Sequence, residues 1–252
     1  MGLFSLLGIG TSGMAAAQLG MDLSGQNIAN ADVEGYSRKR ANMQTSSRYD
    51  ERFGQMGFGV ETVNVERMRN IYIDQQIRRQ NREVGYYEEV DHTFERIENI
   101  FTEPSDTGVM HYIDDFFDAW HNLANNPSDL AARTMVRSTG ETMNEVFHNV
   151  SGELRDLRKT RNDEIEQRVE KVNQLIQEVY NLNLEIGAVE VGNQNANDSR
   201  DRRDMLLKEL AQLIDVDTQE NELGQITVTT AGNVIVSPAS IQKLETTTSS
   251  FK

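Results

Sequence analysis

Apolar and small side chains recur every seven residues near the start of the chain. This spacing places them in a narrow stripe along one face of a helix. The large apolar members of the stripe, which we call the N-terminal seam, are Leu7, Met14, Met21 and Ile28. The row beside it is also apolar or small: Leu3, Gly10, Ala17 and Ser24. No charged residue precedes Asp22, so the pattern predicts a helix whose seam needs a partner surface.

This first helix is expected to end near residues 30–35. Asn30 and Asp32 favour bonds to the local backbone over a continuing helix, and Gly35 can take the positive φ of a sharp exit. Residues 36–66 then alternate short apolar and polar stretches around Gly54, Gly57 and Gly59. That alternation is typical of extended chain with a hairpin-like turn.

Helical spacing returns over residues 71–101, and a shorter predicted helix follows until Asn-Asn-Pro at 125–127. From Asp129 to about Val191 no proline interrupts the pattern, with Ser128 as the expected N-cap. A helix of roughly 60 residues would be on the order of 90 Å long. Its later part carries a heptad pattern in which a polar residue, Asn183, would fix the register. The pattern consists of Ile165, Val169, Val172, Ile176, Val179, Asn183 and Ile186.

The last sixty residues predict a mixed module. Asp198 or Ser199 can cap a helix carrying Leu206 and Leu210, and beyond Asp215 the apolar period changes to two. A strand, a turn at residues 232–233 and a second strand are expected there.

The predicted fold class is therefore mainly α: an elongated long-helix bundle or coiled coil, with an N-terminal helix, a short extended segment and the start of a β-containing outer domain. The predicted domains are an N-terminal assembly helix at 1–35, an elongated domain at 36–191, and an incomplete outer α+β domain at 192–252.

Charge and composition restrict the partners. The chain has 252 residues, of which 40 are acidic and 25 basic, giving a net charge of −15. Because no basic stripe is present, neither nucleic acid nor an anionic membrane surface is an expected partner. The apolar start has no preceding Lys or Arg and is interrupted by Thr11 and Ser12, so neither a cleaved signal peptide nor a membrane span is predicted.

No catalytic, cofactor-binding or metal site is predicted, and no enzyme activity is expected. The chain has no cysteine, its four histidines lack a second ligand at zinc-site spacing, and no phosphate-binding or nucleophile motif occurs. Five oxygen-bearing residues imitate a calcium loop, but Asp198 stands where the sharp turn needs glycine. These five are Asn193, Asn195, Asn197, Asp201 and Asp204.

The charged run at 200–204 and the aromatic residues around Trp120 are both expected to have structural roles. The run Arg-Asp-Arg-Arg-Asp at 200–204 is interpreted as surface ion pairing at the start of a helix, each exposed pair contributing under about 1 kcal/mol. Trp120 stands at helical spacing from Phe116 and beside Phe117, and aromatic residues in such a pattern usually belong to the core. We therefore predict that Trp120 is buried.

The end of the first helix resembles the N-terminal signature of the bacterial flagellar axial proteins, the rod, hook and hook-associated subunits. Their first helix ends in a pattern like NIANxxTPGYxR. Val33 and Glu34 stand where Thr and Pro are usual, and Arg38 matches. The remaining matching positions, here called the axial signature, are Asn27, Ile28, Ala29, Asn30, Gly35 and Tyr36.

Two later stretches resemble the members of this family that form the junction between hook and filament. The stretch at 117–128, which leads from Phe117 and Trp120 into LANNPS, is the first. The second is Asn197-Asp198 followed by DRRDMLL at 201–207, which is similar to the family's NDLLDQRDxLL segment. The resemblance implies a structural flagellar subunit, exported by the flagellar type III apparatus without a cleaved signal peptide and located in the extracellular flagellum.

The same resemblance implies the partners. These are hook subunits, a second junction protein, copies of the chain itself in a ring or helical zone, and an export chaperone acting through a C-terminal part that is missing here. The family also has a C-terminal helix that pairs with the first, and nothing after Gly224 has heptad spacing, so the chain is expected to be a fragment or a shortened relative. The alternatives are a rod or hook subunit, or a coiled-coil scaffold or sensor of another class.

Overall fold

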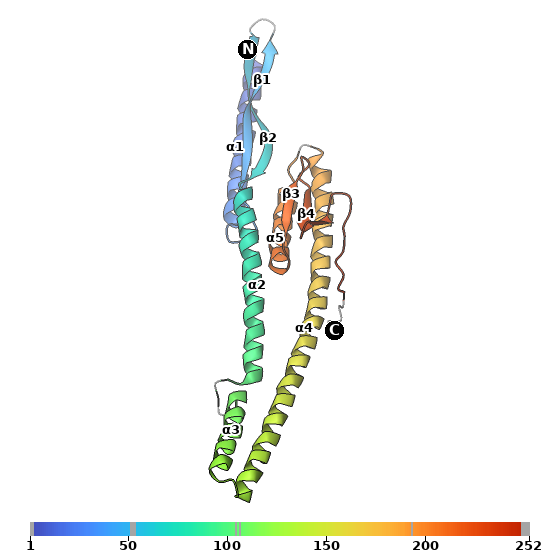
Figure 1. Ribbon diagram of the computed structural model, residues 1–252. Helices are drawn as coiled ribbons and strands as arrows, with labels where there is room; N and C mark the ends of the chain where they lie inside the picture. Colours follow the sequence, from blue (N-terminus) through green and yellow to red (C-terminus); the bar gives the residue numbers. More distant parts are fainter. Residues whose placement is uncertain (1–2, 51–53, 104, 106, 193, 248–252) are drawn as a thin grey trace. The chain divides into compact units, whose positions relative to one another are not determined.

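A computed structural model describes residues 3–50, 54–103, 105, 107–192 and 194–247 (Figure 1). The chain packs as two units. The first contains residues 1–83 and 170–245, and the second contains residues 84–169 and 246–252. All three predicted segments contribute to the first unit, and their role as separate domains stays a prediction. None of the described helices is both long and apolar enough to cross a membrane.

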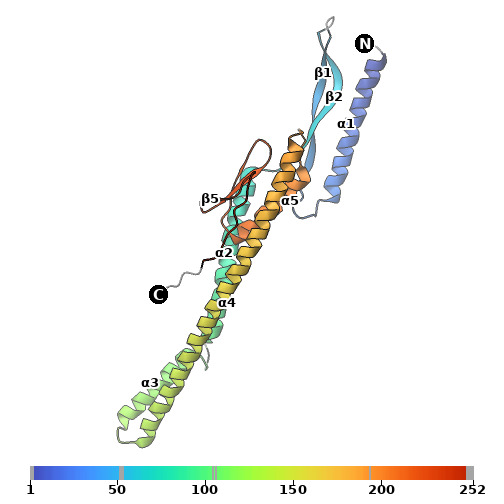
Figure 2. The ribbon, with the colours of Figure 1, turned by 90° about the vertical axis from the view of Figure 1, so that its right-hand side faces the viewer.

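The first unit begins with a helix that packs on a hairpin. Helix α1 (Leu3–Ala29) lies beside the antiparallel strands β1 (Lys39–Asp50) and β2 (Gly54–Arg67), as Figures 1 and 2 both show. The backbone N–H of Val60 donates to Ser12 Oγ at 3.3 Å. Gly59 has φ +102°, and a Cβ there would lie 2.1 Å from Ser12 Oγ, so only glycine permits this close approach. The predicted helix and hairpin are both confirmed.

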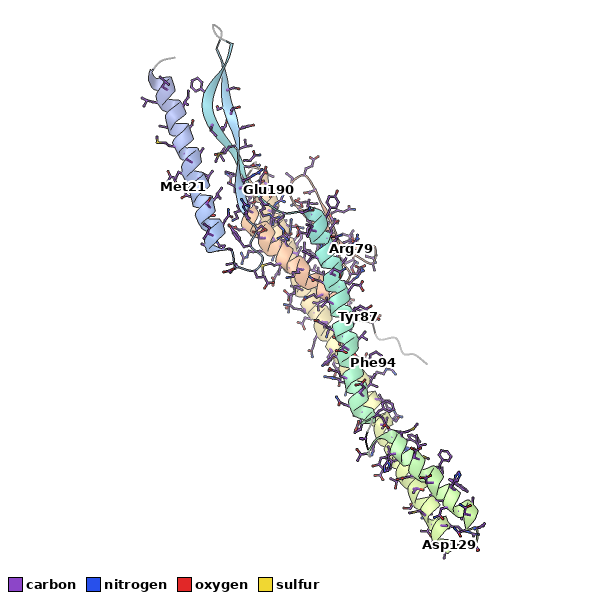
Figure 3. All side chains as sticks on the ribbon, turned by 90° about the vertical axis from the view of Figure 1, so that its left-hand side faces the viewer. Met21, Arg79, Tyr87, Phe94, Asp129 and Glu190 are labelled. Atoms are coloured by element: carbon purple, nitrogen blue, oxygen red, sulfur yellow. The ribbon has the colours of Figure 1, made fainter. Side chains whose placement is uncertain are left out.

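Three further helices match their predicted limits. They are α2 (Ile71–Phe101), α3 (Val109–Asn125) and α4 (Leu130–Glu190). The cap of α4 differs from the prediction by one residue, because Asp129 Oδ1, and not Ser128, accepts from the N–H of Ala131 at 2.9 Å. Such a cap satisfies one of the free donors in the first helical turn. Figure 3 labels Asp129 just before α4 and Glu190 at its last turn.

The chain then forms α5 (Asn197–Leu213) and a small antiparallel sheet of β3 (Asp217–Glu220), β4 (Ile226–Thr230) and β5 (Asn233–Val236), in that order. Strand β3 was not predicted, because its sequence, Asp-Thr-Gln-Glu, has no apolar alternation. The turn between β4 and β5 lies one residue earlier than predicted, since Ala231 (φ +47°) and Gly232 (φ +81°) both take left-handed backbone.

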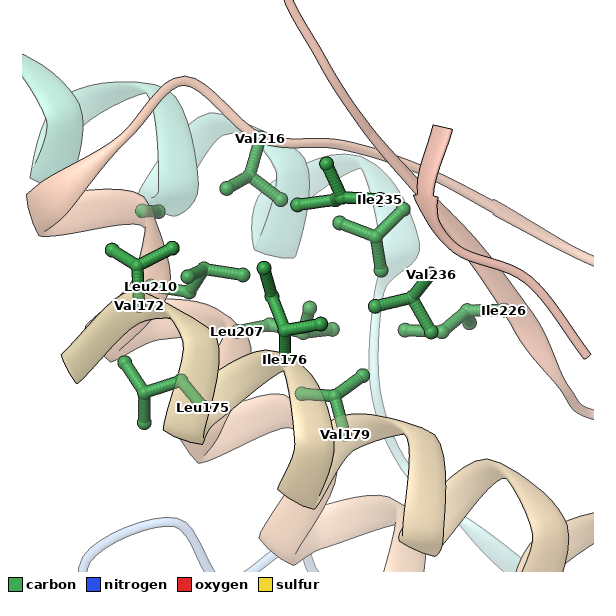
Figure 4. Close-up of a cluster of buried hydrophobic side chains, with 12 residues drawn as sticks. Val172, Leu175, Ile176, Val179, Leu207, Leu210, Val216, Ile226, Ile235 and Val236 are labelled. Atoms are coloured by element: carbon green, nitrogen blue, oxygen red, sulfur yellow. The ribbon is translucent and has the colours of Figure 1, made fainter. Parts of the chain in front are cut away.

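The core of the first unit lies where α4 meets α5 and the sheet (Figure 4). Val172, Ile176 and Val179 of the predicted heptad pattern are buried there, together with Leu175. Their partners lie on α5 and the strands and include Leu207, Leu210, Ile226, Val228, Ile235 and Val236. This middle part of the heptad pattern is therefore covered within the chain and not by a second coiled-coil strand. The first member of the pattern, Ile165, is 53% exposed.

Asn183 has a different role from the predicted one. Its side chain is fully buried, and it bonds to both backbone groups of Ile226: Oδ1 accepts from the N–H at 3.1 Å and Nδ2 donates to the carbonyl at 2.7 Å. Strand β5 pairs with β4 only from Val228 onward, so the Asn183 amide takes the place of a strand beside Ile226 and satisfies its buried backbone groups. Asn183 thus fixes the sheet on α4 and does not set a coiled-coil register.

In the second unit, the prediction that Trp120 belongs to the core is wrong. Trp120 is 47% exposed and Phe117 is 59% exposed, whereas Ala119 is buried. The Trp120 ring packs edge to face on Phe116, with the ring centroids 6.3 Å apart, and about half of its surface stays exposed.

The core predicts a contrast between two leucines on α4. Leu175 is 1% exposed and Leu184 is 46% exposed. Leu175→Ala should lower the free energy of unfolding by about 2–5 kcal/mol, because it removes buried apolar contacts and leaves a cavity. Leu184→Ala is the matched control and should cost well under half as much. Urea denaturation followed by circular dichroism measures both, and equal losses would contradict this core.

Candidate functional site

The axial signature forms a joint between α1 and the start of β1. Asn27 Nδ2 donates to the carbonyl of Lys39 at 2.9 Å, and the N–H of Lys39 donates to Asn27 Oδ1 at 2.9 Å. The Tyr36 hydroxyl donates to the same Oδ1 at 2.9 Å. Asn27 thus pairs with a backbone as a strand would, and it holds the end of the helix beside the strand that follows.

Gly35 supplies the turn inside this joint. Its φ is +82°, as the sequence predicted, and a Cβ at this position would lie 2.0 Å from Met205 Sδ on α5. Any larger residue would strain the backbone and would also have to displace the Met205 side chain. The exit from the first helix is therefore shaped to lie against the helix at 197–213.

The carboxylate of Asp201, on α5, is the centre of the joint. It is buried, with an exposed fraction of 6%. Its Oδ2 accepts from the N–H of Ser37 at 3.0 Å, and its Oδ1 accepts from the Ser37 hydroxyl and from Arg67 Nη1 at 2.7 Å. One carboxylate therefore binds both the segment that enters β1 and the end of β2.

A second carboxylate and a cation complete the network. Arg67 Nη1 also donates to Asp204 Oδ2 at 2.8 Å, and Arg69 donates to the Ser37 hydroxyl at 3.2 Å. Lys39 pairs with the exposed Asp198 and lies 5.4 Å from the Tyr36 ring centroid. Hydrogen bonding to Asp74 raises the pKa of Arg69 above its ordinary value, since the charged guanidinium is the bonded form.

Behind the joint, Arg203 lies buried at 1% exposure. Its Nη1 donates to the carbonyl of Gly224 at 2.6 Å and to Asn183 Oδ1 at 3.2 Å. Burial lowers the pKa of Arg203 to about 10, which still leaves it charged at neutral pH. Arg200 pairs with Glu190 at 2.5 Å and with Glu220 at 2.7 Å.

Two interpretations from the sequence are decided by this geometry. The run at 200–204 was predicted to form surface ion pairs, and this is wrong for Asp201 and Arg203, which are buried. The calcium-like ligands have other roles: the amides of Asn195 and Asn197 both donate to the Val65 carbonyl, at 3.0 and 2.8 Å. Asn193 lies outside the described residues.

The N-terminal seam is exposed along its whole length. The exposed fractions are 57% for Leu7, 67% for Met14, 69% for Met21 and 78% for Ile28. Helix α1 packs on the hairpin through a different face, which includes the buried Ala16 and Leu23. Successive helical residues lie about 100° apart, so Leu23 points about 200° away from Met21. The seam predicted from the sequence is thus left free of the chain (Figure 3 labels Met21).

Several joint residues could not be recognised from the sequence. Ser37 stands at a position that the axial pattern leaves open, and neither Lys39 nor Arg67 belongs to a motif. Ser37 is separated from its partner Asp201 by 164 residues. The two resembling stretches, at the end of α1 and the start of α5, are brought together by these contacts.

More than half of the chain matches a known protein family. The model of the flagellar hook-associated protein FlgK helical domain matches residues 94–252. The chain belongs to this family. It is 29% identical over 218 residues to flagellar hook-associated protein 1 of Bacillus subtilis, across 84% of the chain and 43% of that relative. The protein of the same name from Salmonella typhimurium is 28% identical over 253 residues, across 98% of the chain and 45% of the relative.

The FlgK-family fold also has a solved example. The flagellar hook junction protein FlgK from Burkholderia pseudomallei is similar with a TM-score of 0.56 and 19% identity, over 67% of this chain and 30% of that one. The mainly α fold is therefore shared. The chain spans less than half the length of the curated relatives that it matches.

The joint predicts a local effect of Asp201→Asn. This change keeps the shape but removes the charge that Ser37 and Arg67 share, and hydrogen bonds to charged groups contribute about 2 kcal/mol each. The amide of Ser37 should exchange with deuterium faster, while the amide of Ile226, bonded to Asn183, should keep its protection.

The matched control for this change is Glu209→Gln on the same helix. Glu209 makes a half-exposed pair with Lys171 at 3.0 Å, which contributes under about 1 kcal/mol. Unchanged exchange at Ser37 in Asp201→Asn, or equal acceleration in Glu209→Gln, would show that Asp201 does not hold the joint.

Proposed function

We propose that the chain is a structural subunit of the bacterial flagellum that joins the hook to the filament. The observation that carries the proposal is the exposed N-terminal seam on a helix whose other face is packed. Membership in the FlgK family supports the flagellar context. The printed names of the relatives, hook-associated and hook junction proteins, support the place within it.

The seam is suited to assembly because its apolar side chains are less favourable in water than in contact with another apolar surface. Burying a Met, Leu or Ile side chain that is now exposed gains about 1.5–3 kcal/mol. Four such side chains on one helical face, with no charge before Asp22, form a continuous apolar contact for another subunit. The joint holds the packed side of α1 to the hairpin and thereby keeps the seam turned outward.

The proposed partners are those that the family resemblance implied. They are hook subunits, a second junction protein and further copies of the chain in a ring or helical zone. Export is proposed to proceed through the flagellar type III apparatus, with a chaperone that acts through a further C-terminal part of the protein. The proposed location is the extracellular flagellum, reached without cleavage of a signal peptide.

The two alternatives explain less of the chain. A rod or hook subunit would be expected to turn to β-structure soon after the signature. Here the β1–β2 hairpin follows the signature, but the three helices α2, α3 and α4 come next. A coiled-coil scaffold or sensor would need the heptad pattern of α4 for a second strand. That pattern is covered largely by α5 and the sheet of the same chain.

The proposal is tested by Met21→Asp, carried in the natural gene so that the whole product bears the change. The free helix keeps the new carboxylate in water at little cost, but an assembled apolar contact would bury it unpaired, which is strongly unfavourable. Filament attachment to hooks should be lost and flagellin shed into the medium, with the melting temperature of the purified subunit unchanged.

Gln26→Asp is the matched control. Gln26 is exposed on the same helix and lies about 140° around it from Met21, so the same charge there should leave filaments in place. Electron microscopy of the cells and immunoblots of the medium measure both variants. Normal filaments on the hooks of the Met21→Asp strain would reject the assembly role of the seam.

A further inference from the structure

In the second unit, helix α2 has a packing partner on one side only. Glu89 pairs with Arg161 of α4 at 2.5 Å and also pairs with Arg168 of the same helix. Successive helical residues lie about 100° apart, so Asp91 points about 200° away from Glu89 and its partners. None of the described residues of α2 is buried. The side that faces away from α4, here called the outer face of α2, carries Val84, Tyr87, Asp91, Phe94 and Glu98.

The outer face of α2 exposes large apolar side chains in a regular row. Tyr87 is 63% exposed, Phe94 is 59% exposed and Val84 is 46% exposed. Figure 3 labels Tyr87 and Phe94 along the helix. The five positions of the row follow one another at intervals of three and four residues, which is the spacing of a helix that packs against another helix. The row is therefore suited to a helical partner.

Unpaired carboxylates accompany this row. Asp91 and Glu98 belong to it, and Glu88 and Glu95 stand one residue after Tyr87 and Phe94 at its edge. All four acidic side chains are exposed. Within the part of the chain that the structure describes, none of the four makes an ion pair, whereas Glu89 on the opposite side makes two. The outer face thus combines exposed aromatic rings with negative charge that nothing in the described chain neutralises.

We propose that the outer face of α2 binds a basic amphipathic helix that is not part of this chain. The apolar side chains of such a helix would cover Val84, Tyr87 and Phe94, as in other complexes in which a helix packs on an apolar face. Its Arg or Lys side chains would pair with the four carboxylates, and they can also lie over the aromatic rings.

Charge also argues against a second copy of α2 as the occupant. Two such faces would bring like charges together, which is unfavourable across an interface. The whole chain has a net charge of −15, so opposite charge is more readily supplied by a different polypeptide. This inference does not depend on the flagellar role.

The experiment is a fluorescence anisotropy titration of the full chain with a labelled amphipathic peptide. In each heptad of this peptide, Leu and Ala fill the core positions and Arg fills the flanking ones. A second peptide has Glu in place of every Arg. We expect saturable binding of the Arg peptide and at least about tenfold weaker binding of the Glu peptide, because the latter meets like charge. Equal affinity for both peptides, or no saturable binding of the Arg peptide, would overturn the proposal.

Phe94→Ser and Phe117→Ser form a matched pair, since both rings are 59% exposed in the unchanged chain. Phe94→Ser removes apolar surface from the proposed contact and should weaken binding of the Arg peptide at least about tenfold. Phe117 lies on α3, so Phe117→Ser should weaken it less than about twofold, as for a surface residue outside the contact. Equal weakening by the two variants would reject the outer face of α2 as the site.

A second pair of variants separates the local charge from the charge of the whole chain. Asp91→Asn combined with Glu95→Gln should weaken binding at least about fivefold, as for the loss of two exposed ion pairs. Asp163→Asn combined with Glu166→Gln removes the same charge from exposed positions on α4. This control should have less than about a twofold effect, because exposed charges outside the contact are screened by salt. Equal effects would indicate general attraction to an acidic protein and contradict the proposal.

Two further measurements locate the peptide and test the other occupant. Because the chain has no cysteine, Val84→Cys and Met135→Cys each introduce a single thiol. The Arg peptide should slow maleimide labelling at position 84 and not at position 135, which is exposed on α4. Unchanged labelling at position 84 while the peptide binds would place the peptide elsewhere. Sedimentation velocity without peptide should show no dimer, and a dimer that Phe94→Ser dissociates would assign the face to a second copy and overturn the proposal.

Discussion

The buried carboxylate of Asp201 is the contact on which the position of the hairpin against α5 depends. It accepts from Ser37 at the start of the hairpin and from Arg67 at its end. Two strands joined by a turn are marginally stable in water, so the hairpin needs α1 on one side and α5 at its base. Removing one member of a buried ionic network leaves the others desolvated and unpaired. The helix, the hairpin and α5 are therefore connected through one side chain.

With the hairpin held in place, the two faces of α1 have different surroundings. The face with Ala16 and Leu23 packs on the hairpin, and the face with Leu7, Met14, Met21 and Ile28 stays in water. Asn27 and Gly35 fix where the helix ends and how the chain turns toward α5. A helix held in this way presents its free face in one orientation before any partner arrives, which reduces the ordering cost of association. The apolar seam and the polar joint thus complement each other in the proposed role.

The elements with strong periodicity were predictable from the sequence. Helices α2 and α4 follow long apolar spacing with clear stops, and the φ of Gly35 follows from its place after a helix. The joint was not predictable, because Ser37 and Asp201 are 164 residues apart and a charged run reads as a solvated surface. The prediction that Trp120 is buried was wrong for a related reason. Periodicity shows that one face of a helix is apolar, but it does not show whether another element covers that face. The exposed seam was predicted to need a partner, and the structure leaves it uncovered.

The central claim is that the seam is exposed in the free subunit and buried in the flagellum. Because the chain contains no cysteine, Met21→Cys introduces a single thiol into the seam. The direct measurement compares its rate of maleimide labelling in the purified chain and in isolated hook-filament particles, with Gln26→Cys as the reference. The thiol at position 21 should be labelled rapidly in the free chain and protected in the particles, relative to position 26. Equal labelling at position 21 in both states would contradict it.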